Sequence, residues 1–223
     1  MDLHAVLFDL DDTLHDKSAT LKVVADTQFM AGALENQDID KSSWQSAFLE
    51  LNNLRIEKTE VFARLGQRFG LATDLEKSLL KDFDRNLGSF ARPYAGALEL
   101  LKACKMHGLK TGIVTNGRDQ FQRSKIAGLG ISSFVDSVVT SGGFGLKKPD
   151  HAIFLESLRQ LSVTPQHAAF VGDDFQADMV PANALGMQAI WKSGGTSGTV
   201  AFSSDSLMKI QSFLLPASSK WRP

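Results

Sequence analysis

Carboxylates gather at two places in this sequence, each directly after an apolar run. Asp9 and Asp11 follow the first apolar run of the chain, and Asp173 and Asp178 follow a later one at residues 168–172. Hard divalent cations prefer oxygen ligands, so these carboxylates suit Mg²⁺. Asp9 could attack an electrophile and form a covalent intermediate, while Asp11, two residues on, could move a proton. The two clusters together indicate metal-assisted group transfer.

Polar and basic residues supply the hydrogen-bond donors and the positive charge that the carboxylates lack. Thr13 completes the first cluster, Thr115 and Asn116 come at the end of another apolar run, and the pair Lys147 and Lys148 follows later. A phosphoryl group needs hydrogen-bond donors and positive charge, because carboxylates alone repel it. We assign the charged role to Lys148, although the tandem is ambiguous by one position.

The apolar runs that carry these residues are short, as the strands of a parallel sheet are. Helical patterns lie between them, and strands alternating with helices predict a parallel sheet covered on both faces. The expected fold class is α/β, with a Rossmann-like, doubly wound sheet core and ligands at the carboxyl ends of its strands. The expected strands are 4–8, 111–115, 137–140, 168–172 and 188–191, and the expected helices are 98–106, 119–127, 151–161, 176–185 and 207–215.

One long stretch, residues 18–90, interrupts this alternation. It contains amphipathic helical patterns and no convincing strand, so it predicts an inserted helical domain. Glycine and proline near both ends of the stretch suit linkers. We expect a core domain at 1–15 and 91–223 and a helical cap domain at 16–90. The last helix is expected to be opened by Ser204 or Asp205.

Composition and charge narrow the class of partner. The 223 residues are 43% apolar and 22% charged, which is ordinary for a globular protein, and the formal net charge is −1. Nucleic acids and anionic membranes need clustered positive charge, so neither is expected as a partner. No apolar run is long enough to span a bilayer, and the single cysteine, Cys104, cannot form an internal disulfide. We therefore expect a cytoplasmic protein that acts on a small molecule.

Four short motifs occur in order at the ends of expected strands. The segment Asp9-Leu10-Asp11-Asp12-Thr13 comes first, Thr115 second, Lys148 third, and Gly172-Asp173 followed by Asp178 fourth. Each motif alone is weak, but the ordered set resembles the haloacid dehalogenase-like hydrolase superfamily, in its phosphatase branch. The resemblance covers nearly the whole chain, and that family places a helical cap between its first and second motifs, where the strandless stretch lies.

The resemblance implies a site and a mechanism. Mg²⁺ would be bound by the Asp9 carboxylate, the Asp11 main-chain carbonyl and Asp173, with Asp178 in support and Asp174 as a further ligand of lower rank. Asp9 would form an aspartyl-phosphate, and Asp11 would act as general acid and base. The substrate implied is a small phosphorylated metabolite. Its phosphoryl oxygens would be held by Thr13, Thr115, the amide of Asn116 and Lys148.

Three other functions stay open at this stage. A 2-haloacid dehalogenase of the same fold needs neither a general acid nor a metal, so Asp11 and Asp173 argue against it. A phosphomutase would pass the phosphoryl group to a sugar, and a non-catalytic regulatory or binding protein would keep only the fold. The oligomeric state is also open.

The histidines are interpreted as structural. His4 and His167 lie at element edges and are expected to be surface or capping groups. His15 lies where the chain leaves for the cap, and a structural role is favoured for it as well.

Overall fold

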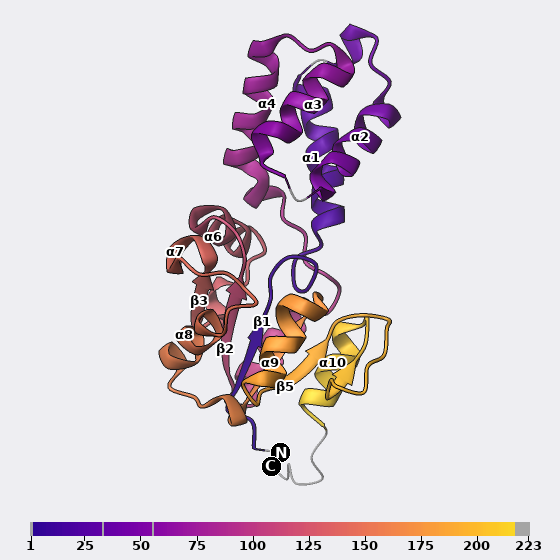
Figure 1. Ribbon diagram of the computed structural model, residues 1–223. Helices are drawn as coiled ribbons and strands as arrows, with labels where there is room; N and C mark the ends of the chain where they lie inside the picture. The colour runs from indigo at the N-terminus through magenta and orange to yellow at the C-terminus, as the bar shows by residue number, and fades with distance from the viewer. Residues whose placement is uncertain (1, 33, 55, 217–223) are drawn as a thin grey trace. The chain divides into compact units, whose positions relative to one another are not determined.

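The computed structural model describes residues 2–32, 34–54 and 56–216. Within it the chain forms two compact units, one built from residues 1–16 and 93 onward and the other from residues 17–92 (Figure 1). The first unit contains the sheet and is called the α/β unit. Among its described residues, the second contains helices and no strand, and it is called the helical unit.

A six-stranded parallel sheet forms the α/β unit, in the order β3-β2-β1-β4-β5-β6. Strand β1 is central, pairing Phe8 with Ile113 on one side and with Val171 on the other. Its four residues are all buried, which explains its unbroken apolar sequence. The predicted fold class is confirmed. The strands are β1 (Ala5–Phe8), β2 (Lys110–Thr115), β3 (Ser137–Thr140), β4 (Ala168–Gly172), β5 (Gln188–Trp191) and β6 (Phe202–Ser203).

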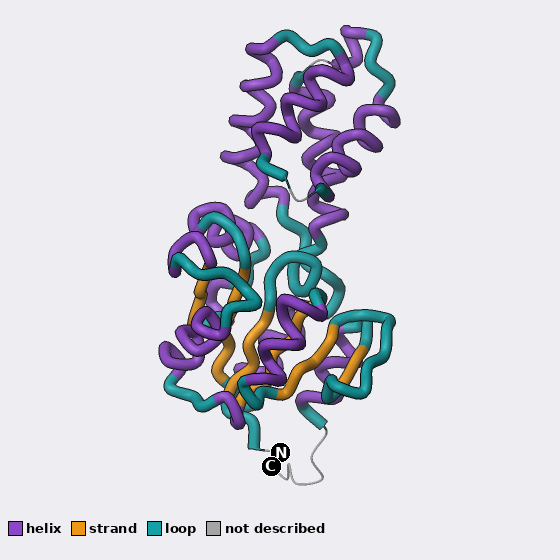
Figure 2. Tube along the Cα trace, in the orientation of Figure 1, coloured by secondary structure: helices purple, strands orange, loops and turns teal. Residues whose placement is uncertain are grey.

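Helices cover both faces of this sheet (Figure 2). On one face α8 packs on β2 and β3, and α9 packs on β5 and on α8; α5 also contacts β2 and adjoins α10. In Figure 1, α8 and α9 lie in front of the sheet. The helices of the unit are α5 (Ala97–Met106), α6 (Asp119–Gly128), α7 (Ser141–Phe144), α8 (His151–Leu161), α9 (Val180–Ala184) and α10 (Leu207–Leu214), with short turns η3 (Ser132–Phe134) and η4 (Pro165–His167).

Two expectations about helices need correction. The helix expected at 176–185 is a π-helical turn, η5 (Phe175–Met179), followed by the short helix α9, because Pro181 lacks the N–H that would continue the earlier turn. The last helix is opened by Ser206, whose side chain accepts a hydrogen bond from the Lys209 amide, and not by Ser204 or Asp205. Both differences are local, and the elements themselves are where the sequence placed them.

The helical unit is held together by aromatic side chains. Trp44, Phe48, Phe62 and Phe83 are buried at its centre, with ring centroids 5.5 to 6.2 Å apart along the chain of contacts. The indole of Trp44 donates to the Ala25 carbonyl, which satisfies its polar atom in the core. The elements of the helical unit are α1 (Lys17–Ala31), η1 (Leu34–Gln37), α2 (Lys41–Asn53), α3 (Lys58–Phe69), α4 (Thr73–Asn86) and η2 (Leu87–Phe90).

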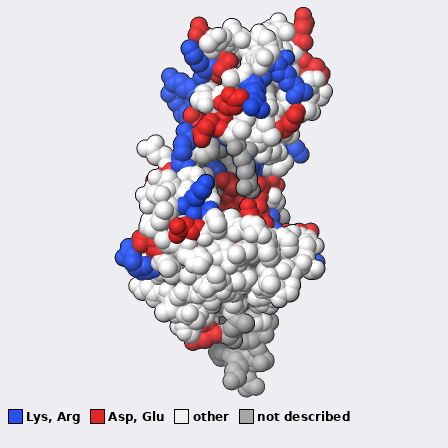
Figure 3. Space-filling view, viewed as in Figure 1, with Lys and Arg blue, Asp and Glu red and all other residues white. Residues whose placement is uncertain are grey.

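Surface charge on the helical unit is mixed. On the face drawn in Figure 3, positive and negative side chains are interspersed over this unit. Among the described residues, no helix is both long enough and apolar enough to cross a membrane.

Candidate active site

The order of the strands creates one place where a ligand site is expected. From β1 the chain proceeds outward through β2 to β3, and then returns to β4 on the other side of β1 before reaching β5 and β6. Neighbouring strands whose connections run in opposite directions leave a crevice at their carboxyl ends. Asp9 follows β1 and Asp173 follows β4, so the two carboxylates flank this crevice.

A tight loop after β1 presents the first motif. The amides of Leu14 and His15 both donate to the Leu10 carbonyl, and Asp12 takes a left-handed conformation with φ of 59°. Aspartate tolerates this conformation better than most residues. The loop turns Thr13 inward, where its buried hydroxyl donates to Asp173 Oδ1 at 3.1 Å. The first and fourth motifs are therefore in direct contact.

Three carboxylates converge at this point. Asp9, Asp173 and Asp178 each offer an oxygen within 4.8 Å of the others. Asp178 reaches the cluster only because Gly172 has no side chain, since a Cβ there would lie 2.6 Å from Asp178 Cγ. Burial, followed by repulsion from Asp9, raises the pKa of Asp173 to about 7. Carboxylates that are crowded together in this way, with a raised pKa, can be stabilised by a bound divalent cation such as Mg²⁺.

Lys148 partly balances this negative charge. Its buried Nζ lies 2.6 Å from Asp9 Oδ1 and 2.7 Å from Asp178 Oδ1. Burial opposes the charge on Lys148, but Asp9 and Asp178 outweigh it and hold the pKa of the lysine above its usual range. Lys147 is exposed, so the structure brings only Lys148 of the tandem into the cluster.

Asn116 fixes the backbone from which Lys148 projects. Its side-chain oxygen accepts from the Lys148 amide at 2.8 Å, and its side-chain nitrogen donates to the Lys148 carbonyl at 3.1 Å. The end of β2 is thereby tied to the loop that precedes α8. The sequence pattern predicts a role only for the main-chain amide of Asn116, because nothing in it shows where the side chain points.

A second lysine binds Asp11. Lys125 Nζ lies 2.7 Å from both Asp11 oxygens, and His15 Nδ1 lies 2.6 Å from Oδ1. Burial opposes the charged form, but Lys125 and His15 outweigh it and hold the pKa of Asp11 well below its usual range. Asp11 is thus an anion in this arrangement.

Gln122 links Asp11 to Thr115. Its buried Nε2 lies 2.6 Å from Thr115 Oγ1, 3.1 Å from Asp11 Oδ2 and 3.0 Å from the Asn116 carbonyl. The hydroxyl expected to hold a phosphoryl oxygen is therefore oriented by the same helix, α6, that supplies Lys125. One helix sets the positions of groups from the first and second motifs.

Lys192 and Tyr94 border the first motif. Lys192 Nζ donates to the Asp12 carbonyl at 2.8 Å and lies 3.5 Å from the centre of the Tyr94 ring. Burial lowers the pKa of Lys192, whereas burial and nearby carboxylates, Asp12 foremost among them, raise that of Tyr94 to about 12. Sequence reasoning found neither residue, because nothing in the local pattern marks them.

Asp174 has a different structural role from Asp173 and Asp178. Its Oδ1 accepts from the amides of Gln176 and Ala177, both at 3.0 Å, and so it caps the start of η5. It is not among the three carboxylates that converge. The turn that Asp174 begins carries Asp178 inward, so its contribution to the site is through Asp178.

Comparison with known proteins assigns the family. The sequence pattern of haloacid dehalogenase-like hydrolases matches residues 6–192, which include all four motifs. The chain belongs to this family. The expected resemblance is therefore confirmed, and the matched range contains every residue placed in the site above.

Relatives of this haloacid dehalogenase-like hydrolase carry phosphatase names. The glyceraldehyde 3-phosphate phosphatase of Methanothermobacter thermautotrophicus is 32% identical over 200 residues, covering 84% of each chain. That of Methanocaldococcus jannaschii is 30% identical over 197 residues, covering 83% of this chain and 82% of its own. The prediction of a phosphoric monoester hydrolase agrees with these names.

Solved structures support the same fold. A HAD phosphatase from Thermococcus onnurineus superimposes with a TM-score of 0.64 at 25% identity, covering 95% of this chain and 98% of that one. The putative HAD-hydrolase YfnB from Bacillus subtilis, bound to magnesium, superimposes with a TM-score of 0.72 at 20% identity, covering 96% and 100%. At that identity the second likeness concerns the fold alone.

Proposed function

We propose that this hydrolase is a Mg²⁺-dependent phosphatase that cleaves a small phosphomonoester through an aspartyl-phosphate on Asp9. The observation that carries the proposal is the convergence of Asp9, Asp173 and Asp178 beside the buried ammonium of Lys148. Such a set suits a dianionic substrate, because a cation and a lysine together offset the carboxylates. The phosphatase names of the relatives support it.

Different residues of the site would bind the metal, attack phosphorus and bind the phosphoryl group. Asp9, the Asp11 carbonyl and Asp173 would hold Mg²⁺, with Asp178 in support, and the ion would offset charge on the phosphoryl oxygens. A carboxylate oxygen of Asp9 attacks phosphorus as the bond to the leaving oxygen breaks, which forms the aspartyl-phosphate. The Thr115 hydroxyl, the Asn116 amide and Lys148 would bind the transferring group.

Asp11 has to change its protonation state during the reaction. In the first step it donates a proton to the leaving oxygen, and in the second it takes one from the water that attacks the aspartyl-phosphate. The contacts with Lys125 and His15 describe the anionic form, which is the form needed for the second step. In the first step the oxygen of Asp11 that carries no proton would still accept from Lys125, which keeps the acid in position.

Phosphate release tests the proposal directly. Purified protein is assayed with an aryl phosphate and with a panel of phosphomonoesters that begins with glyceraldehyde 3-phosphate, because relatives are named for it. We expect activity with Mg²⁺ and none in EDTA. Undiminished activity in EDTA would contradict the metal assignment. Halide release from 2-haloacids would favour a dehalogenase, and an isomerised sugar phosphate would favour a mutase.

Mg²⁺ should stabilise the protein more at neutral than at acidic pH. Burial, together with repulsion from Asp9, raises the pKa values of Asp173 and Asp178 to about 7, from an ordinary 3.8. The folded chain then binds more protons than the unfolded chain between these values, so stability without metal falls as pH rises from 4 toward 7. We expect Mg²⁺ to raise Tm by at least about 3 °C more at pH 7.5 than at pH 5.5.

The control for that measurement is Asp173→Asn, which removes one of the repelling charges. The Mg²⁺ effect should disappear in this variant, and the metal-free protein should lose less stability between the two pH values. An equal gain in Tm at both pH values in the unaltered protein would show that the ion binds elsewhere.

Replacing Lys125 should slow the chemistry more than it weakens substrate binding. Lys125→Met removes the ammonium that positions Asp11, and we expect kcat to fall about 10- to 100-fold with KM nearly unchanged. The loss should be larger for an alkyl phosphate than for p-nitrophenyl phosphate, because a good leaving group needs less protonation. Steady-state kinetics on both substrates measure this.

Two further variants separate a role at Asp11 from a general effect of losing a lysine. Lys125→Arg keeps the charge and should recover part of kcat. Lys105→Met removes an exposed lysine of α5 that contacts the Ser133 carbonyl, and it should change neither parameter. Equal losses on both substrates in Lys125→Met would argue against a link to leaving-group protonation.

A further inference from the structure

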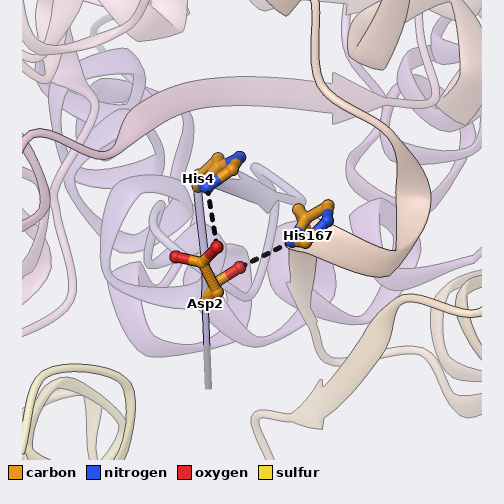
Figure 4. Close-up of side chains that lie close together, drawn as sticks. All are labelled: Asp2, His4 and His167. Carbon is orange, nitrogen blue, oxygen red and sulfur yellow. Dashed lines mark hydrogen bonds and ion pairs between the residues drawn. The ribbon is translucent and has the colours of Figure 1, made fainter.

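Two histidines lie side by side at the end of the sheet away from the active site. His4 directly precedes β1 and His167 directly precedes β4, and the His4 amide donates to the His167 carbonyl at 2.8 Å. The two residues continue the pairing of Ala5 with Ala168. Figure 4 shows Asp2 with them. Asp2 comes two residues before His4, the spacing that puts side chains on one face of an extended segment.

Their side chains offer nitrogen and oxygen ligands at close range. The imidazole rings are stacked, with centroids 4.7 Å apart and an interplanar angle of 12°. His4 Nε2 lies 3.3 Å from Asp2 Oδ2, and one ligand atom from each of the three residues lies within 4.8 Å of the others. No other part of the described chain brings two histidines and a carboxylate together in this way.

Hydrogen bonding leaves His167 in the form that binds metals. His167 Nδ1 lies 2.9 Å from the Asp2 carbonyl oxygen. A carbonyl can only accept, so Nδ1 carries the proton and Nε2 keeps its lone pair. Metal-binding histidines commonly donate their second nitrogen to a carbonyl in this manner, which fixes the tautomer and the ring.

We propose that Asp2, His4 and His167 form a binding site for a divalent transition-metal ion at the amino ends of β1 and β4. Two imidazoles and a carboxylate suit Zn²⁺, Ni²⁺, Co²⁺ or Cu²⁺, whereas Mg²⁺ prefers oxygen ligands only. Metal–nitrogen bonds are about 2.0–2.1 Å long, so the ligands must close in around the ion. The side chains of His4 and Asp2 are 52% and 80% exposed, which leaves them free to turn, and water completes the coordination.

The site would join the two central strands. Their carboxyl ends carry Asp9 and Asp173, and the bound ion would cross-link their amino ends. Asp2 and His167 are 165 residues apart in the sequence and meet only in the folded chain, so the ion binds the folded state and stabilises it. This inference does not depend on the proposed phosphatase activity.

Nickel titration tests the site. Full-length protein without added histidines is saturated with Mg²⁺, so that the carboxylate cluster is occupied, and Ni²⁺ binding is followed by calorimetry and by Tm. We expect one Ni²⁺ per chain and a rise in Tm. His167→Gln and His4→Gln should each weaken binding by about 10-fold or more.

The matched control is His107→Gln. His107 is exposed and its Nδ1 also bonds a carbonyl, that of Ala103, but among the described residues it belongs to no group of three possible metal ligands. Ni²⁺ binding should be unchanged in this variant and in Asp173→Asn. Unchanged binding in His167→Gln, or an equal loss in His107→Gln or Asp173→Asn, overturns the proposal. Should His4→Gln prove unstable, Asp2→Asn replaces it and is expected to weaken Ni²⁺ binding too.

Discussion

Asp9→Asn is expected to abolish phosphate release, with kcat reduced by about 10⁴-fold or more. An amide oxygen is a poor nucleophile, and the carboxylate of Asp11 is held by Lys125 and His15, so it does not replace Asp9. The comparison is made under saturating Mg²⁺ and substrate, so that the rate reports the chemical step. A rapid acid quench with labelled substrate adds a direct readout: the unaltered protein should carry covalent phosphate, and the variant none.

The fold should survive this substitution. Asparagine has the size of aspartate and keeps an oxygen that can accept from Lys148, which also retains Asp178. One of three repelling charges is removed, so Tm should be unchanged or higher. Asp74→Asn, at an exposed position in the first turn of α4, controls for the chemistry of the substitution. Retention of more than a trace of activity by Asp9→Asn would rule out Asp9 as nucleophile.

The fold was largely predictable because buried parallel strands have a simple signature. The runs at β1 and β4 are apolar without interruption, since both faces of the sheet are covered. Strand β6 was missed because two half-buried residues, Phe202 and Ser203, leave no pattern to detect. The π-helical turn η5 was predicted as ordinary helix. Five residues are too few for the spacing of apolar positions to distinguish a π-helix from an α-helix.

The site was predictable where one segment of sequence carries the chemistry. The residues of the first motif are neighbours in the loop after β1, but their spacing alone is weak and indicates a site only together with Thr115, Lys148 and Asp173. The charged role was assigned to Lys148, but the residues alone left the tandem ambiguous by one position, since the choice depends on which side chain the loop turns inward. That orientation is set by hydrogen bonds to Asn116, more than thirty residues away in sequence.

Lys125 and Gln122 were overlooked although the sequence holds a clue. Together with Ile126 and Leu129 they follow the spacing of the buried face of α6, and all four are buried. Polar residues on an apolar helix face need partners, so two of them in one stripe indicate a polar site beneath the helix. Which partners they have is a tertiary fact, because Asp11 lies over a hundred residues earlier.

Lys148→Met should both inactivate and destabilise the protein. The ammonium lies between Asp9 and Asp178, and all three side chains are buried. Removing one partner of a buried ion pair leaves uncompensated charge, which typically costs about 3–5 kcal/mol. We expect a loss of unfolding free energy of that order at pH 7.5, measured by urea denaturation, and a fall in kcat of about 10³-fold under saturating Mg²⁺.

The pH dependence of the unfolding free energy identifies why Lys148→Met destabilises the protein. Asp178 already has a raised pKa through burial, and removing Lys148 raises it further, so at pH 5.5 this carboxyl takes a proton and the stability penalty should shrink. Lys147→Met is the matched control, since it removes the adjacent, exposed lysine and should alter stability by no more than about 0.5 kcal/mol. If Lys147→Met inactivated the protein and Lys148→Met did not, the roles within the tandem would have to be exchanged.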